Sequence, residues 1–184
     1  MTRPVLLGIC GALRADSTNR KLLNEAARLF GEAEFAIADL DFPLYDGDAE
    51  DANGIPQAVQ TLSDQIAAAD AVIISTPEYN KGVTGVLKNA LDWVSRTKGN
   101  PWKDKPVATM SAAAGRAGGE RAQVMLRACL TAFRPRLLLG PEIALHDSAN
   151  QFDENGRLTG ELYEKNLDTL MQSLRAEIAD WQPA

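Results

Sequence analysis

The segment spanning residues 11–20 carries four side chains suited to binding an anion. It runs from an apolar stretch directly into a helical pattern, and it contains Arg14, Ser17, Thr18 and Asn19. The N-terminus of a helix leaves backbone N–H groups unpaired and bears a partial positive charge, which favours a phosphate. The hydroxyl, amide and guanidinium donors beside it suit a terminal phosphomonoester. The alternative interpretation is that Ser17 or Thr18 only caps the helix.

A second segment, residues 75–93, predicts a rigid turn that exposes main-chain groups. Pro77 fixes one backbone angle, and two glycines further on permit tight bends. Exposed N–H and C=O groups suit the polar edge of a flat heteroaromatic ring. Taken singly, Tyr79 and Trp93 are equally well explained by packing, and for Trp93 we favour packing.

A third segment, residues 111–119, combines Ser111 and Arg116 with three glycines, the first of which is Gly115. Glycines allow the backbone to approach a ligand closely. Arg116 is either a partner for negative charge on that ligand or an ordinary solvated cation, and the residues alone leave both interpretations open.

Motifs for several other functions are absent. The sequence contains neither the dinucleotide-binding GxGxxG nor the GxxxxGK[ST] of a P-loop. His146 is the single histidine, which excludes a His-rich metal site, and no GxSxG motif accompanies it. Cys10 and Cys129 lie outside any CxxC pattern, so we expect both to be buried as small apolar residues.

Short apolar runs alternate with amphipathic stretches along the whole chain. Strands are predicted over residues 5–10, 35–39, 71–75, 107–111 and 136–139, and helices over residues 19–30, 55–69, 84–95, 119–133 and 160–181. The runs are apolar throughout instead of alternating, which is typical of parallel strands covered on both faces.

This alternation predicts one α/β domain over residues 1–184, a three-layer, doubly wound, five-stranded parallel sheet. In such sheets ligands bind beyond the carboxyl ends of the strands, where the winding direction switches. The three polar segments follow the first, third and fourth predicted strands. They are therefore expected to meet at one site.

The net charge of −6 and the pI near 4.9 argue against binding to nucleic acid or to an anionic membrane, because both require a basic surface. No apolar stretch approaches the roughly 18 residues of a membrane span. Arg3 and the apolar residues 5–13 resemble a weak signal peptide, but Arg14 and Asp16 end the run and no cleavage site follows. We therefore expect a buried first strand in a cytoplasmic protein. The acidic run 46–51 is expected to be a solvated loop.

The order and spacing of the motifs resemble those of the NADPH-dependent FMN reductase family. The matching strings are Gly11-x-Leu13-Arg14-x-x-Ser17-x-Asn19, Pro77-Glu78-Tyr79-Asn80 and Gly85-x-Leu87-Lys88-Asn89-Ala90-Leu91-Asp92-Trp93. The family includes bacterial flavin, quinone, chromate and azo-dye reductases with a flavodoxin-like fold. The resemblance covers nearly the whole chain and weakens after about Leu139. Ala12 stands where the family usually has serine, so one hydroxyl of the phosphate loop is missing.

The resemblance implies FMN as cofactor and NADPH or NADH as co-substrate. It places the FMN phosphate on Arg14, Ser17, Thr18 and Asn19, the ring and ribityl chain along Pro77, Glu78, Tyr79 and Asn80, and the other edge of the ring on Ser111, Gly115 and Arg116. No side chain is expected to act as a catalytic acid, base or metal ligand, because the flavin itself carries the hydride and electron chemistry.

The resemblance also implies the reaction and the assembly. Hydride passes from NAD(P)H and then, in a ping-pong sequence, to flavins, quinones, chromate, ferric complexes or azo compounds. Relatives are homodimers or homotetramers in which the region of residues 42–45 lies near the partner's flavin. Two alternatives remain: a flavodoxin-type electron carrier without NAD(P)H oxidation, and a nucleotide-binding regulatory module without redox chemistry.

Overall fold

A parallel five-stranded sheet lies at the centre of the computed structural model, which describes residues 3–180. The strands are β1 (Val5–Cys10), β2 (Glu34–Ile37), β3 (Ala71–Thr76), β4 (Pro106–Ala112) and β5 (Arg136–Leu145). They are ordered β2-β1-β3-β4-β5, and each neighbouring pair is parallel. The chain winds one way from β1 to β2 and the other way from β3 to β5. The prediction of a doubly wound α/β sheet is confirmed.

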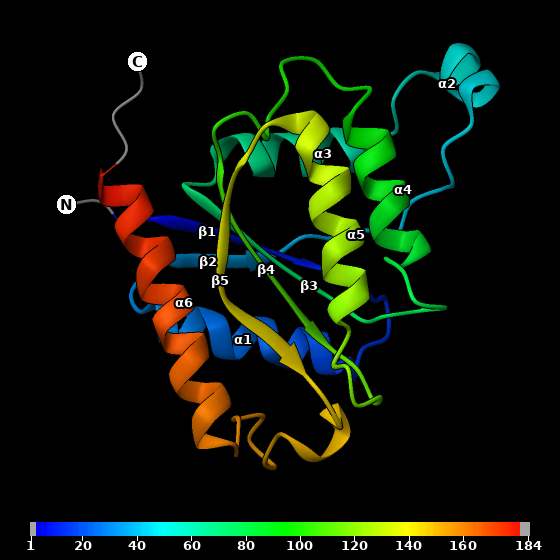
Figure 1. The fold of residues 1–184 in the computed structure, drawn as a ribbon. Helices are drawn as coiled ribbons and strands as arrows, with labels where there is room; N and C mark the ends of the chain where they lie inside the picture. Colours follow the sequence, from blue (N-terminus) through cyan, green and yellow to red (C-terminus); the bar gives the residue numbers. More distant parts are fainter. Residues whose placement is uncertain (1–2, 181–184) are drawn as a thin grey trace.

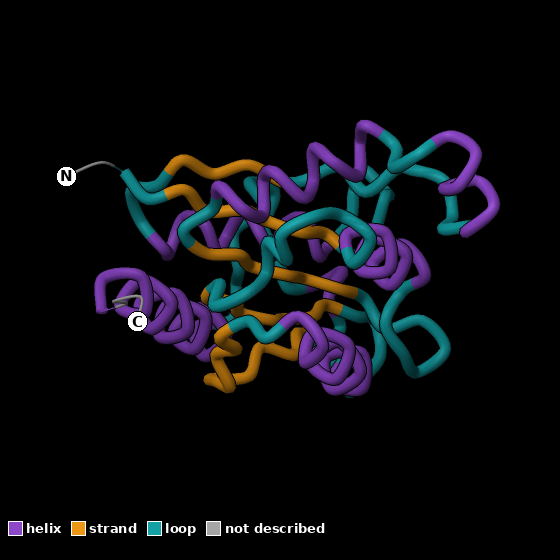
Figure 2. The backbone as a smooth tube through the Cα atoms, turned by 90° about the horizontal axis from the view of Figure 1, so that it is seen from above, coloured by secondary structure: helices purple, strands orange, loops and turns teal. Residues whose placement is uncertain are grey.

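Helices cover both faces of this sheet (Figures 1 and 2). The helices α1 (Thr18–Phe30) and α6 (Glu161–Asp180) pack on one face, and α3 (Gln57–Ala68), α4 (Gly85–Val94) and α5 (Glu120–Leu130) pack on the other. In α1, the apolar residues recur at helical spacing and are buried against the sheet: Leu22, Leu23, Ala26 and Phe30. An apolar core therefore lies on each side of the sheet, which gives three layers.

The predicted helices are found with small shifts at their ends. Residues 119–133, predicted as one helix, divide into α5 and a 3₁₀ turn at Thr131–Phe133. The second strand covers Glu34–Ile37 instead of residues 35–39. Trp181, the predicted end of the last helix, lies outside the described residues. Within residues 3–180, no helix is both long and apolar enough to cross a membrane.

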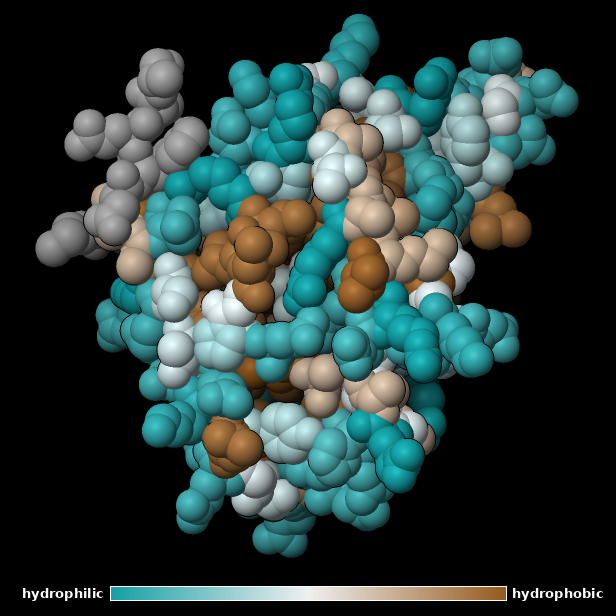
Figure 3. Space-filling view, in the orientation of Figure 1, coloured by the Kyte–Doolittle hydropathy of each residue, from teal (hydrophilic) through white to brown (hydrophobic). Residues whose placement is uncertain are grey.

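The strand β5 runs further than its apolar pattern predicts. The sequence predicts a strand over residues 136–139, but the strand continues past Pro141 to Leu145. Because β5 lies at the edge of the sheet, a proline is tolerated within it. Apolar surface lies over this edge between α5 and α6 (Figure 3), where Leu139 is 78% exposed.

The acidic run 46–51 forms a short helix, α2 (Gly47–Asn53), where the sequence predicts a loop. Asp46 is its N-cap, and its carboxylate accepts a hydrogen bond from Asp48 N at 2.9 Å. Asp48 and Glu50 lie in the first turn, where the helix dipole favours negative charge. None of the helix's residues is buried, and α2 projects from the body of the molecule (Figure 1). The prediction of solvation is right and the prediction of a loop is wrong.

The loop of residues 42–45 is held against α4 by Trp93 and Asn89. Trp93 is 1% exposed, and its Nε1 donates to Pro43 O at 2.8 Å. Asn89 donates to the same oxygen at 3.0 Å and accepts from Tyr45 N at 2.8 Å. The rings of Tyr45 and Trp93 meet edge to face, with centroids 5.0 Å apart. The packing interpretation of Trp93 is confirmed, and the same residue also anchors the loop.

The two cysteines and the histidine, to which the sequence analysis assigns no redox or metal role, differ in their burial. Cys10 is 2% exposed and Cys129 is half-buried, so burial is as expected for the first and only partial for the second. His146 is exposed, with its ring edge against Tyr163 at a centroid distance of 5.8 Å.

A buried carboxylate, that of Glu25, joins α1 to the segment that precedes α6. It accepts two hydrogen bonds from Arg28 at 3.0 Å, one from Arg157 at 3.2 Å and one from Leu158 N at 3.3 Å. Burial by itself would raise the pKa of Glu25. The hydrogen bonds from Arg28 and Leu158 and the two positive charges outweigh burial and lower the pKa below its usual 4.5.

Stability is therefore expected to fall in acid partly through Glu25. Because the folded pKa lies below the unfolded one, this stabilisation is complete above about pH 4.5 and is lost as the pH falls through the lowered pKa. Glu25→Gln places an amide donor against donors, so it should cost about 1–3 kcal/mol at pH 7 and should flatten the decline in acid. Urea unfolding at pH 7 and pH 4 measures both effects. The exposed Glu154→Gln is the control, and equal acid declines in both variants would contradict the expectation.

Candidate functional site

A hollow of about 420 Å³ lies at the C-terminal ends of β1, β3 and β4, where the winding direction of the sheet reverses. Eight of the eleven residues predicted to bind a cofactor line it: Arg14, Ser17, Thr18, Asn19, Pro77, Glu78, Tyr79 and Gly115. The other lining residues are Ala12, Asp16, Ala112, Ala113, Ala114, Ser148 and Ala149. The sequence-based expectation that the three polar segments meet at one place is met.

The first wall of the hollow is the loop between β1 and α1. Ser17 is the N-cap of α1, and its hydroxyl accepts a hydrogen bond from Asn19 N at 3.2 Å. The capping interpretation of Ser17 is therefore confirmed, and the residue also borders the hollow. Arg14 is exposed, and among residues 3–180 no carboxylate pairs with it. This wall offers an anion a cation and a helix N-terminus.

Asn19 lies differently from the other residues of the first wall. Its side chain is only 1% exposed and is turned into the sheet, where Oδ1 accepts from Ser75 Oγ and from Ala112 N at 2.8 and 3.0 Å. Its Nδ2 donates to Ala112 O at 2.8 Å. The sequence identifies Asn19 as polar and close to the site, but it does not show which way the amide points.

The second wall follows β3 and is built on a tight hairpin. Tyr79 and Gly82 exchange two backbone hydrogen bonds, of 3.2 and 3.1 Å, across Asn80 and Lys81. Asn80 and Lys81 both have positive φ angles, of 50° and 65°. The hairpin holds Tyr79 58% exposed at the rim, while Asn80 lies in the turn outside the residues that line the hollow.

Glu78 links the second wall to α5. Its carboxylate accepts from Arg121 N at 3.1 Å and lies 3.6 Å from the Arg121 guanidinium. The N-cap of α5 is Gly119, which has no side chain for capping, so Glu78 supplies the missing acceptor across the chain. Its side chain therefore joins the second wall to α5, and the residue also lines the hollow.

The third wall follows β4 and is seated on the sheet by two glycines. Gly118 and Gly119 have φ angles of +60° and +94°, and a Cβ on Gly119 would lie 2.7 Å from Ser111 Cβ. Ser111 is fully buried under this loop, where its hydroxyl donates to Gly118 O at 2.7 Å and accepts from Gln123 Nε2 at 2.8 Å. The structure thus gives Ser111 a place beneath the wall, outside the lining of the hollow. Arg116 is exposed on the same loop and is also outside that lining.

A fourth wall, which the sequence analysis missed, comes from the chain after β5. Ser148 and Ala149 line the hollow, and Ser148 Oγ accepts a hydrogen bond from Thr18 Oγ1 at 3.1 Å. Ser148 N donates to Ala113 O at 3.2 Å, which ties this wall to the third. The position of this segment in the sequence could have predicted the fourth wall. In a parallel sheet β5 ends on the same side as β1, β3 and β4, so the residues after it are expected near the same site.

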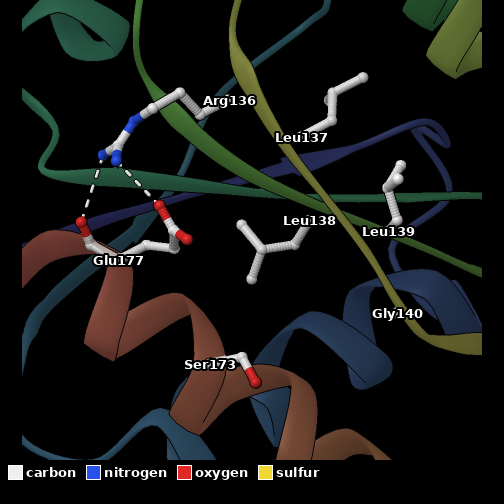
Figure 4. A pocket seen from close by; sticks show the side chains of 7 residues that line it. All are labelled: Arg136, Leu137, Leu138, Leu139, Gly140, Ser173 and Glu177. Carbon is white, nitrogen blue, oxygen red and sulfur yellow. Dashed lines mark hydrogen bonds and ion pairs between the residues drawn. The ribbon is translucent and has the colours of Figure 1, made fainter. Parts of the chain in front are cut away.

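Another hollow, of about 270 Å³, lies between β5 and α6 and contains none of the predicted site residues (Figure 4). It begins at the N-terminal end of β5, whereas the first hollow lies at the C-terminal ends of the strands. Arg136 in it donates to the Glu177 carboxylate at 2.8 Å and to Asp104 O at 3.0 Å. Its charged groups are thus engaged with each other, and we assign the hollow no ligand.

Comparison with known proteins identifies the family of this chain. The sequence model of the NADPH-dependent FMN reductase family matches residues 4–150. This chain belongs to that family. The predicted membership is confirmed, and with it the family's cofactor, FMN, and its reductant, NAD(P)H.

Individual relatives of this FMN reductase family agree with the assignment. The chain is 42% identical over 173 residues to an NAD(P)H-dependent FMN reductase of Pseudomonas aeruginosa, covering 93% of this chain and 91% of the relative. It is 37% identical over 172 residues to a quinone reductase of Escherichia coli K12, covering 91% and 90%. The solved structure of FerB, an NAD(P)H:(acceptor) oxidoreductase of Paracoccus denitrificans, superposes with a TM-score of 0.85 at 32% identity, over 96% of this chain and 97% of that one. The flavodoxin-like fold is confirmed.

The residues of the hollow fit the FMN of this family. The first wall has the donors for a phosphate, and the volume lies in the range of small-molecule sites. Four of the lining residues are alanines, at positions 12, 112, 113 and 114, and their short side chains leave room for a flat ring. Serine in place of Ala12 would add one hydroxyl, but the main-chain donors of α1 do not depend on it.

Proposed function

We propose that this protein is an NAD(P)H-dependent FMN and quinone reductase that binds FMN in the hollow at the ends of β1, β3 and β4. One observation carries the proposal: the same hollow contains a helix N-terminus suited to a phosphate and the exposed ring of Tyr79. The names of its relatives, an FMN reductase and quinone reductases, support the same activity.

The walls of the hollow divide the binding of the cofactor between them. Arg14, Ser17, Thr18 and the N–H groups of α1 hold the phosphate. Pro77, Glu78 and Tyr79 offer main-chain groups and one ring to the flavin, and the small residues up to Gly115 admit its other edge. Bound FMN supplies hydride and electron transfer. The chain's own part is to bind, to orient and to leave one side accessible.

We propose that the open rim admits a broad range of acceptors. Tyr79, which lines the hollow, is 58% exposed. We propose that NAD(P)H and the acceptor occupy this accessible side in turn. Flavins, quinones, chromate, ferric complexes and azo compounds are then all candidates, because the same flat surface receives each of them.

Steady-state rates with NADPH and a quinone are expected to give parallel double-reciprocal lines. The reason is that one shared position forces the donor to leave before the acceptor binds. Unrelated acceptors should also compete with each other. Intersecting lines, together with a ternary complex seen by direct binding, would show two separate positions, and Tyr79 would then not border a shared one.

One absorbance experiment tests the proposed function itself. The purified protein should carry a yellow chromophore that NADPH bleaches without oxygen, and heat-released flavin should run as FMN on chromatography. An electron carrier of the flavodoxin type would be yellow but would not be bleached by NADPH. Release of FAD, or a colourless protein that binds no FMN, would contradict the assignment.

We propose, in addition, a homodimer or homotetramer working in the cytoplasm. Leu44 in the loop of residues 42–45 is 78% exposed, and an apolar side chain on a loop so firmly attached to α4 suits a subunit contact. Light scattering of the parent and of Leu44→Asp measures the assembly. A monomeric parent would contradict this part of the proposal and leave the activity in place.

A further inference from the structure

Asn19 connects three chain segments that surround the proposed FMN site. Its amide oxygen accepts hydrogen bonds from Ser75 Oγ near the end of β3 and from Ala112 N at the end of β4, at 2.8 and 3.0 Å. Its amide nitrogen donates to Ala112 O at 2.8 Å. One side chain on the first wall is thus joined to both strands that carry the second and third walls.

We call the hydrogen-bonded set of Asn19, Ser75 and Ala112 the brace, because it holds the start of α1 against the ends of β3 and β4. An amide oxygen has two lone pairs, and both are engaged. The pair of bonds to Ala112 copies the pairing of a neighbouring strand, so the side chain completes the hydrogen bonding of β4. The three partner groups are the Ser75 hydroxyl and the backbone N–H and C=O of Ala112, and both residues are buried. Leaving such a buried polar group unpaired costs more stability than one hydrogen bond contributes.

We propose that Asn19 is a positioning residue for cofactor binding. It fixes the N-terminus of α1, with Ser17 and Thr18, relative to β3 and β4, and it thereby sets the affinity for the phosphate of FMN without touching that phosphate. This inference rests on the proposed function and replaces the direct contact that the family resemblance implies for Asn19.

Ser75 provides the decisive variant, because it cannot contact a ligand. It is fully buried, it does not line the hollow, and its hydroxyl donates to Asn19. The matched control is Ser63→Ala, since Ser63 is 3% exposed and shares one hydroxyl bond of 2.9 Å with Thr97, away from the hollow. Each variant removes one buried hydroxyl, so both should lose similar stability.

Affinities for FMN and riboflavin, which differ only in the phosphate, are measured for Ser75→Ala, Asn19→Ala, the double variant and Ser63→Ala. Ser75→Ala should weaken FMN binding about fivefold, the weight of one neutral hydrogen bond, with riboflavin changed less than about twofold. Asn19→Ala should weaken FMN binding at least about tenfold, and adding Ser75→Ala should not weaken it further, because both act through one brace. Ser63→Ala should leave the ratio of the two affinities unchanged.

Three results of these binding measurements would overturn the proposal. An unchanged ratio in Ser75→Ala would make the brace merely structural, additive effects would make Asn19 a direct ligand, and a shifted ratio in Ser63→Ala would indicate general loosening. Ser75→Ala decides alone if Asn19→Ala does not fold. Amide exchange at Ala112, measured without flavin, should be faster in Ser75→Ala and unchanged in Ser63→Ala. It tests the brace even if the parent binds no FMN, and equal exchange in Ser75→Ala and the parent would overturn it.

Discussion

Replacing Gly118 with alanine is expected to displace the third wall of the hollow and to weaken FMN binding at least about tenfold, or ~1.4 kcal/mol. Gly118 has a φ of +60°, a conformation that costs an L-residue about 1 kcal/mol. An added Cβ would also collide with the backbone oxygen of Ala144 in β5, which does not yield as a flexible side chain does. The loop must then lift from the sheet and lose the hydrogen bond from Ser111 Oγ to Gly118 O.

Titration with FMN, followed by flavin fluorescence, measures this effect, and thermal unfolding run alongside it shows whether the domain is still folded. Gly85→Ala is the control, because a Cβ at Gly85 meets nothing within 4 Å and the residue has no positive φ. The control should bind FMN like the parent. Unchanged binding by a folded Gly118→Ala would mean that the third wall does not contact the cofactor.

Arg14→Ala is expected to weaken FMN binding by about tenfold to a hundredfold, because a hydrogen bond to a charged group contributes roughly 1.5–3 kcal/mol. Arg14 is exposed on the first wall, and within residues 3–180 no carboxylate competes for it. Riboflavin lacks the phosphate, so its affinity should be almost equal in variant and parent. The comparison therefore isolates the phosphate from the ring.

The second anchor, Ser17, needs a substitution that respects its place as the N-cap of α1. Glycine removes the hydroxyl and costs a cap only a few tenths of a kcal/mol, whereas alanine costs more. Arg14→Ala with Ser17→Gly should weaken FMN binding further than Arg14→Ala. Lys98→Ala, a change of equal charge on an exposed residue, is the control for the general field. A large loss of riboflavin binding in either Arg14 variant would indicate a rearranged loop and contradict the phosphate assignment.

The backbone of this protein follows closely from its sequence, because burial on both faces leaves an unbroken apolar run. The first strand is found at the predicted residues, Val5–Cys10, and the third differs by one residue at its end. Prediction ended β5 too early, since Gly140 and Pro141 are ordinarily signals to stop. Pro141 is tolerated because β5 is an edge strand, where one missing backbone donor does not interrupt the sheet. Whether a strand lies at the edge depends on the whole topology and cannot be predicted from the local sequence.

The directions of the side chains at the site were predicted less well from the sequence than the backbone was. The family resemblance implies that Asn19 and Ser111 contact the cofactor, and the structure turns both side chains into hydrogen bonds within the protein. The partners of Asn19 lie far away in the sequence: Ala112 is 93 residues from it. Thr18 meets Ser148 across 130 residues. A single sequence read along the chain does not contain those pairings, which arise only when the strand ends are assembled.

The helix α2 has an energetic consequence of its own. No residue of Gly47–Asn53 is buried. The Glu50 side chain ties this helix to the rest of the protein: it accepts a hydrogen bond from the Tyr45 hydroxyl at 3.1 Å and pairs with Arg96, just after α4, with 2.9 Å between Oε2 and Nε. Opening this helix therefore exposes little apolar surface and breaks few hydrogen bonds, so its local unfolding is separate from that of the sheet. A protease should cut there first and leave a nicked but folded molecule. For the same reason, an inserted tag at this place should be tolerated where an insertion next to α1 is not.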